Sequence, residues 1–124
     1  MLLIDPKAEQ QPARPGDDNR LDAVYQYVLG HFSEELTTKQ EASLACMQEA
    51  AFCRYFKRRS HKTFSQFVNA VRVTHATHLL AQESSIAAIC YASGFGNISY
   101  FNRPFKALTG YAPLAYRKTL RESR

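Results

Sequence analysis

The chain has little of several residue types, and each shortage argues against a class of protein. Its 124 residues contain no tryptophan, five glycines, five prolines and three cysteines, and no Cys-x-x-Cys pair. So few glycines and prolines, with no alternating apolar and polar runs, favour an all-α chain over a β-sheet protein. An odd number of cysteines without paired spacing is typical of reduced thiols in an intracellular protein.

Long apolar runs are also missing. None approaches the ~20 residues of a membrane-spanning helix, and the apolar start, residues 1–4, is too short for a signal peptide because Asp5 follows at once. We therefore expect a cytoplasmic protein that does not enter a membrane.

The sequence offers no catalytic motif. It has no glycine-rich phosphate loop, no Gly-x-Ser-x-Gly and no paired carboxylates in its basic segment. His75 and His78 are three residues apart, but no nearby cysteine or carboxylate completes a metal site. We expect no enzymatic activity, no cofactor and no metal.

The charge is distributed unevenly, although the net charge is only +5. Residues 1–36 hold three Lys or Arg against seven Asp or Glu, a net charge of −4, and residues 37–124 hold 13 against four, a net charge of +9. A basic segment of this kind favours a polyanionic partner, without separating DNA from RNA or an acidic membrane.

That basic segment contains a short repeat. Residues 52–57 and residues 101–106, 49 positions later, both read Phe-x-Arg-x-Phe-Lys. On a helix the two Phe of each copy share one face, and the Arg and Lys point away from it. The repeat predicts two helices that are buried by aromatic side chains and present cations to a partner, most plausibly nucleic acid.

Apolar spacing and capping residues predict the other helices. We expect helices over 19–31, 38–45, 49–59, 64–81, 98–108 and 113–120, and a short helix after Ser85, with Thr37, Ser85 and Ser99 as N-caps. This order divides the chain into a leader over 1–18, a first helix-turn-helix subdomain over 19–62, a linker helix over 63–82 and a second subdomain over 83–121. The ~18 residues of the linker helix span roughly 27 Å, near the ~34 Å between successive major grooves on one face of DNA.

The second subdomain resembles the C-terminal signature of the AraC/XylS family of bacterial transcription regulators. The positions that carry the resemblance are Ile86, Ile89, Gly94, Phe95, Ser99, Tyr100, Phe101, Arg103, Phe105, Lys106, Gly110, Pro113, Tyr116 and Arg117. A looser match runs through His31, Phe32, Phe52, Arg54, Phe56, Lys57, Phe64, Arg72, Ala76, Leu79 and Leu80. The resemblance implies a seven-helix, homeodomain-like domain with two helix-turn-helix subdomains, and it implies that the effector-binding domain usual in the family is absent from this chain.

Several positions depart from the family pattern, among them Cys90, which replaces a small residue in the helix after Ser85. Thr38 and Glu41 stand where apolar residues are preferred, and Gln48 replaces the serine that would cap the first recognition helix. His61 replaces a glycine where we expect a left-handed backbone. Pro104 lies beyond the first turn of the second recognition helix, where we expect it to cost a hydrogen bond or to kink the helix.

The resemblance also implies which residues contact DNA. The base-reading positions correspond to Glu49, Ala50, Cys53 and Arg54 in the first subdomain and to Asn97, Ile98, Ser99, Asn102 and Arg103 in the second. Lys57, Arg58, Lys106 and Arg117 are expected to contact phosphates. The expected partners are double-stranded promoter DNA and RNA polymerase.

Two other functions stay open at this point. One is a helical protein-interaction module, for instance one that docks on RNA polymerase, in which the first subdomain no longer reads bases. A weaker one is a fragment of a DNA-repair methyltransferase fused to an AraC-like unit. Sequence-specific binding of double-stranded DNA by two recognition helices in successive major grooves is the main expectation.

Overall fold

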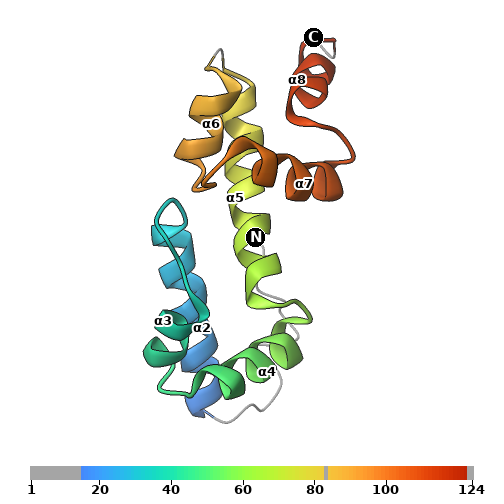
Figure 1. Ribbon diagram of the computed structural model, residues 1–124. Coiled ribbons are helices and arrows are strands. Elements are labelled where there is room, and N and C mark those ends of the chain that lie inside the picture. Colours follow the sequence, from blue (N-terminus) through green and yellow to red (C-terminus); the bar gives the residue numbers. More distant parts are fainter. Residues whose placement is uncertain (1–14, 83, 123–124) are drawn as a thin grey trace.

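The fold of the computed structural model is all-α, as predicted. The structure describes residues 15–82 and 84–122, and this part of the chain forms seven helices and no strand (Figure 1). The helices are α2 (Pro15–His31), α3 (Thr38–Leu44), α4 (Glu49–Ser60), α5 (Phe64–Leu80), α6 (Ile86–Ala92), α7 (Ile98–Thr109) and α8 (Pro113–Glu122).

Most predicted helix boundaries agree with the structure to within two residues. The exception is the first helix, which begins at Pro15, four residues before the predicted start at Asn19. The rest of the predicted leader, residues 1–14, lies outside the described residues.

Side chains cap most of these helices. Thr37 accepts a hydrogen bond from the backbone N–H of Gln40, and the Gln40 side chain accepts one from the N–H of Thr37. Thr63 and Gln66 repeat this capping box at the start of α5. Such reciprocal bonds satisfy two of the amides that a helix start leaves free, so local sequence defines where α3 and α5 begin.

Helix α5 is the common support of two separate hydrophobic cores (Figure 1). Its first half places Phe64 and Val68 in a core with residues of α2, α3 and α4. Its second half places Val73, Ala76 and Leu80 in a core with residues of α6 and α7. The chain is therefore two small helical units that share one helix.

The repeated aromatic pairs are the centres of the two cores, as predicted. Phe52 and Phe56 of α4, and Phe101 and Phe105 of α7, are fully buried. Edge-to-face contacts join Phe56 to Phe64, and Phe105 to Tyr116, at ring-centroid distances of 5.6 and 5.4 Å. Burying four phenyl rings anchors both helices by their inner faces.

The two helices end in the same way. His61 after α4 has φ of 64°, which confirms the predicted left-handed residue, and Gly110 after α7 has φ of 87°. A histidine tolerates this conformation at a cost that glycine avoids. In both, the capping N–H donates to the carbonyl four residues earlier, of Lys57 and Lys106 respectively.

Pro104 lies inside α7, as expected, but does not end it. The helix continues to Thr109, although Pro104 has no N–H to donate to the carbonyl of Tyr100. The buried rings of Phe101 and Phe105 flank the proline and hold this segment against the second core. Tertiary packing thus offsets the lost hydrogen bond.

Candidate nucleic-acid interface

Helix α4 has one buried and one exposed face. Phe52, Tyr55 and Phe56 face the first core. The exposed positions include Glu49, Ala50, Cys53, Arg54, Lys57 and Arg58, the residues assigned to this helix from the sequence. The fold therefore presents all of them on the outer side of α4.

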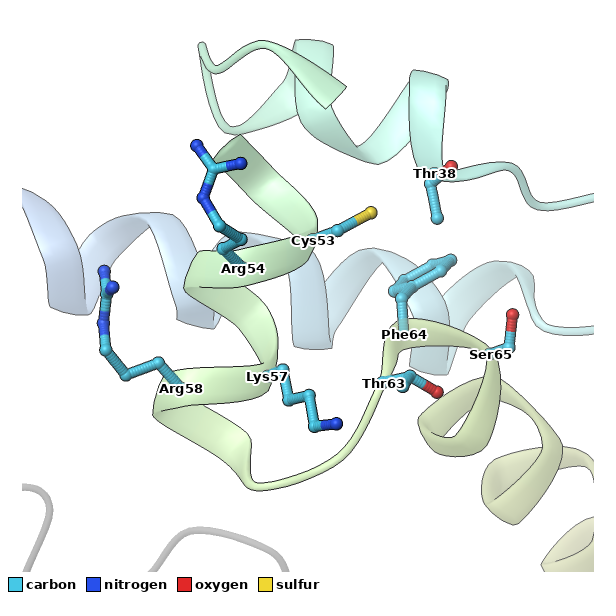
Figure 2. A pocket seen from close by; sticks show the side chains of 8 residues that line it. All are labelled: Thr38, Cys53, Arg54, Lys57, Arg58, Thr63, Phe64 and Ser65. Atoms are coloured by element: carbon cyan, nitrogen blue, oxygen red, sulfur yellow. The ribbon is translucent and has the colours of Figure 1, made fainter. Parts of the chain in front are cut away.

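A groove runs along this exposed face (Figure 2). It encloses about 580 Å³ and is lined by Thr38, Cys53, Arg54, Lys57, Arg58, Thr63, Phe64 and Ser65. Three of these residues are cations, and the first turn of α5 forms one wall (Figure 2). Free backbone amides of a helix start add positive potential there, so the groove is suited to an anion.

Glu49 has a role inside the first unit. The Thr38 hydroxyl of α3 donates a hydrogen bond to its carboxylate, which ties α3 to the start of α4. Gln48, the N-cap of α4, makes no side-chain capping bond, whereas a carboxylate in the first turn interacts favourably with the helix dipole. Glu49 thus supports the position of α4, a use that the assignment to base reading did not foresee.

Helix α7 repeats the arrangement in the second unit. Ile98, Ser99, Asn102, Arg103 and Lys106 are exposed, opposite the buried phenyl rings. The predicted cap at Ser99 is wrong.

Asn97 is the N-cap of α7 instead. Its side-chain oxygen accepts a hydrogen bond of 2.7 Å from the N–H of Tyr100. Asparagine is among the best N-caps, and the NH₂ group of its carboxamide takes no part in this bond.

Tyr100 was not among the residues singled out for this surface. Its side chain is 47% exposed, and its hydroxyl accepts a hydrogen bond of 3.3 Å from Asn69 Nδ2 of α5. The sequence signals for it are its place in the family signature and its position in the first turn of a recognition helix.

Arg117 is used within the fold. Its Nε donates to the carbonyl of Leu80 at 3.2 Å, and one Nη donates to the carbonyl of Ser84 at 2.5 Å. These bonds attach α8 to the end of α5 and to the segment that follows it. Because its guanidinium is bonded within the fold, Arg117 is not proposed as a phosphate contact.

Two negative findings concern the described residues alone. In the part of the chain that the structure describes, no group of three His, Cys, Asp or Glu is placed to hold a metal ion. No helix among the same residues has the length and apolar character needed to cross a membrane.

Comparison with known families decides what this architecture is. A family model described as a helix-turn-helix domain matches residues 42–119, more than half of the chain. The chain belongs to the AraC-type helix-turn-helix family. The matched residues include α4 and α7, the two helices with exposed cationic faces. This match confirms the resemblance to the AraC/XylS family that the sequence predicted.

Curated relatives in this family are regulatory proteins. The chain is 30% identical over 107 residues to the regulatory protein PocR of Salmonella typhimurium, covering 86% of this chain and 35% of PocR. It is 30% identical over 95 residues to YobQ of Bacillus subtilis, an uncharacterised helix-turn-helix transcriptional regulator, covering 76% of this chain and 39% of YobQ. The chain thus spans little more than a third of the length of these family members.

Solved structures of the family share the fold. The DNA-binding domain of the transcriptional factor AdpA, determined in complex with a target DNA, is 26% identical with a TM-score of 0.79, covering 85% of this chain and 96% of that one. The C-terminal domain of AraT, a response regulator from Geobacillus stearothermophilus, is 26% identical with a TM-score of 0.74, covering 88% of each chain.

Proposed function

We propose that this chain binds double-stranded promoter DNA sequence-specifically as the DNA-binding domain of a bacterial transcription regulator. Its two recognition helices, α4 in residues 19–62 and α7 in residues 83–121, enter successive major grooves. Like other regulators of its family it is a binding protein and not an enzyme.

One observation carries this proposal. Two helices with the same aromatic anchors each present an exposed Arg and Lys from one shared support, α5. The similar domain of AdpA, a structural match over 85% of this chain, was solved on its target DNA. Two recognition helices on one supporting helix suit a binding site with two half-sites about one helical turn apart.

Two groups of exposed residues are proposed to contact DNA, one at the bases and the other at the phosphates. We propose base contacts from Ala50, Cys53 and Arg54 of α4 and from Asn97, Ile98, Ser99, Asn102 and Arg103 at the start of α7. Glu49 is omitted because its carboxylate accepts the bond from Thr38. Phosphate contacts are proposed from Lys57, Arg58 and Lys106. Guanidinium groups pair well with guanine O6 and N7, and an asparagine pairs with adenine. The groove beside Lys57 is a place for a backbone phosphate, because cations and first-turn amides of α5 meet there.

A selection experiment tests the proposal. The purified chain is used to select from random duplex DNA, and its affinity for the enriched site and for a shuffled site is measured across a salt series. A specific domain keeps at least a 1,000-fold preference at physiological salt. Equal affinity for both DNAs at every salt concentration would rule out sequence-specific binding.

Arg103 and Lys106 should respond differently to alanine substitution. We expect Arg103→Ala to lose about 1–3 kcal/mol on the selected site and to relax the preference at one base pair. Lys106→Ala should weaken binding to all duplexes about equally and reduce the salt slope by about one. Fluorescence anisotropy on the selected site and on DNA with single-base changes measures the affinity of both proteins. Equal losses of affinity on every DNA sequence for Arg103→Ala and Lys106→Ala would show that neither side chain reads bases.

Cys53 provides a probe that needs no substitution. It is exposed on α4, as is Cys46 in the segment before α4, whereas Cys90 is buried. A maleimide should therefore label Cys53 and Cys46 and leave Cys90 unmodified. We expect the selected DNA to slow labelling of Cys53 about tenfold or more when it occupies most of the protein. Peptide mass spectrometry measures each cysteine separately, and shuffled DNA is the control. Unchanged labelling at saturating DNA would place Cys53 outside the interface.

The complete regulator has a further partner in this proposal. We propose that it acts in the cytoplasm, where promoter DNA lies, and that it contacts RNA polymerase when bound. The second unit exposes three large apolar side chains, Tyr91, Leu108 and Leu114, which support a protein contact by this unit. Cross-linking to purified RNA polymerase on the selected promoter, with and without charged substitutions at these positions, tests it.

A further inference from the structure

Arg72 lies on α5 at the junction between the two units. It lies between Val71, which packs against the first core, and Val73 of the second core. Its Nε donates a hydrogen bond of 2.8 Å to the carbonyl of Phe32, and one Nη donates a bond of 2.9 Å to the carbonyl of Glu34. The guanidinium thus holds the segment between α2 and α3, which belongs to the first unit.

The same guanidinium contacts the second unit. Its Cζ lies 5.9 Å from the centre of the Phe95 ring, within the range of a cation–π interaction. Gly94, the residue before Phe95, lies close to both Arg72 and Phe32. A Cβ added to Gly94 would lie 2.8 Å from Arg72 Nε and 2.3 Å from the Phe32 carbonyl oxygen. The turn before α7 therefore abuts both Arg72 and the first unit.

From this junction, contacts lead directly to a recognition helix. The Phe95 ring packs against Phe101 and Tyr100 of α7 at centroid distances of 5.0 and 6.0 Å. Tyr100 is also hydrogen-bonded to Asn69, one helical turn before Arg72 on α5. Arg72 is thereby connected to the first turn of α7, where base contacts begin.

We propose that Arg72 is a positioning residue that sets the spacing between the two half-sites the protein accepts. The inference rests on the proposed DNA binding. Each base pair added between half-sites moves the second by ~3.4 Å along the axis and turns it by roughly 35°. Two recognition helices held in one relative orientation match one half-site spacing. Loosely joined helices accept neighbouring spacings as well, but they bind the best site more weakly because they are not preorganised for it.

The chemistry of the side chain suits this task. A guanidinium presents several N–H donors in one rigid plane and still offers its face to an aromatic ring, so it joins three segments at once. A lysine ammonium lacks this planar fork, and a methionine keeps most of the side-chain length but has no donor.

Spacing preference is the decisive measurement. Affinities of the parent chain, Arg72→Lys and Arg72→Met are compared on the selected full site, on each isolated half-site, and on full sites lengthened or shortened by one base pair. Arg121→Met, on the exposed end of α8, is the control for the loss of one positive charge. For Arg72→Met we expect about a tenfold loss on the full site, less than a twofold change on the half-sites, and a smaller penalty for altered spacing.

The outcomes separate this inference from the proposed function. Failure of the parent chain to prefer any selected site contradicts DNA recognition itself. If the parent is specific and Arg72→Met keeps the same full-site affinity and the same spacing penalties, Arg72 does not position the units. If circular dichroism shows that Arg72→Met is unfolded, the Arg72→Lys variant is decisive. An unchanged spacing preference of Arg72→Lys overturns the proposal, and a relaxed spacing preference supports it.

Discussion

Replacing Gly94 with alanine should lower the stability of the domain by about 2–4 kcal/mol. Gly94 has φ of +98°, a conformation that L-residues rarely adopt. The added methyl group would lie 2.3 Å from the Phe32 carbonyl oxygen and 3.0 Å from Ser33 Cα, both backbone atoms. Backbone strain and steric overlap therefore add at the junction of the two units.

Thermal unfolding followed by circular dichroism measures the effect of Gly94→Ala. For a domain of this size we expect Tm to fall by roughly 10 °C or more. Gly96→Ala is the matched control two residues away, because a Cβ there meets nothing within 4 Å. A Gly94→Ala protein as stable as Gly96→Ala would show that the close approach to Phe32 is relieved at little cost.

Replacing Glu41 with leucine should stabilise the protein by about 1–3 kcal/mol at neutral pH. Glu41 is 1% exposed, and its Oε1 has no hydrogen-bond partner among the described residues. Burial raises the pKa of this carboxyl above its ordinary value of 4.5, an effect that the charge of His31 opposes. An apolar side chain at this position removes the cost of burying an ionisable group.

The gain from Glu41→Leu should depend on pH. A carboxyl whose pKa is raised by folding binds its proton more tightly in the folded state than in the unfolded chain. As the pH rises above 4.5, the folded protein therefore loses stability relative to the unfolded chain. This loss stops once the pH exceeds the raised pKa. The advantage of the variant is therefore smallest near pH 4 and reaches its full size at neutral pH. Urea unfolding at several pH values measures it, and Glu35→Gln, at an exposed position, is the control for the lost charge. An advantage that does not vary with pH would show that folding does not shift the pKa of this carboxyl.

The predicted helices agreed closely with the structure because their signals are local. Capping boxes at Thr37 and Thr63 and the four-residue spacing of each phenylalanine pair act within one or two turns. The choice between Ser99 and Asn97 as the cap of α7 was wrong because both are good caps and lie two residues apart. Which exposed residues touch bases stays a prediction.

The sequence by itself determined the all-α fold, the two aromatic-anchored helices and the cationic faces opposite their anchors. Helical periodicity is enough for this, since a helix with one apolar stripe buries that stripe and exposes the rest. The tertiary structure alone decided which polar side chains are used inside the fold. Arg72 and Arg117 bond to backbone carbonyls that are 33 to 40 residues away. Every residue type except proline offers the same backbone donors and acceptors, so no pattern in the sequence marks such partners.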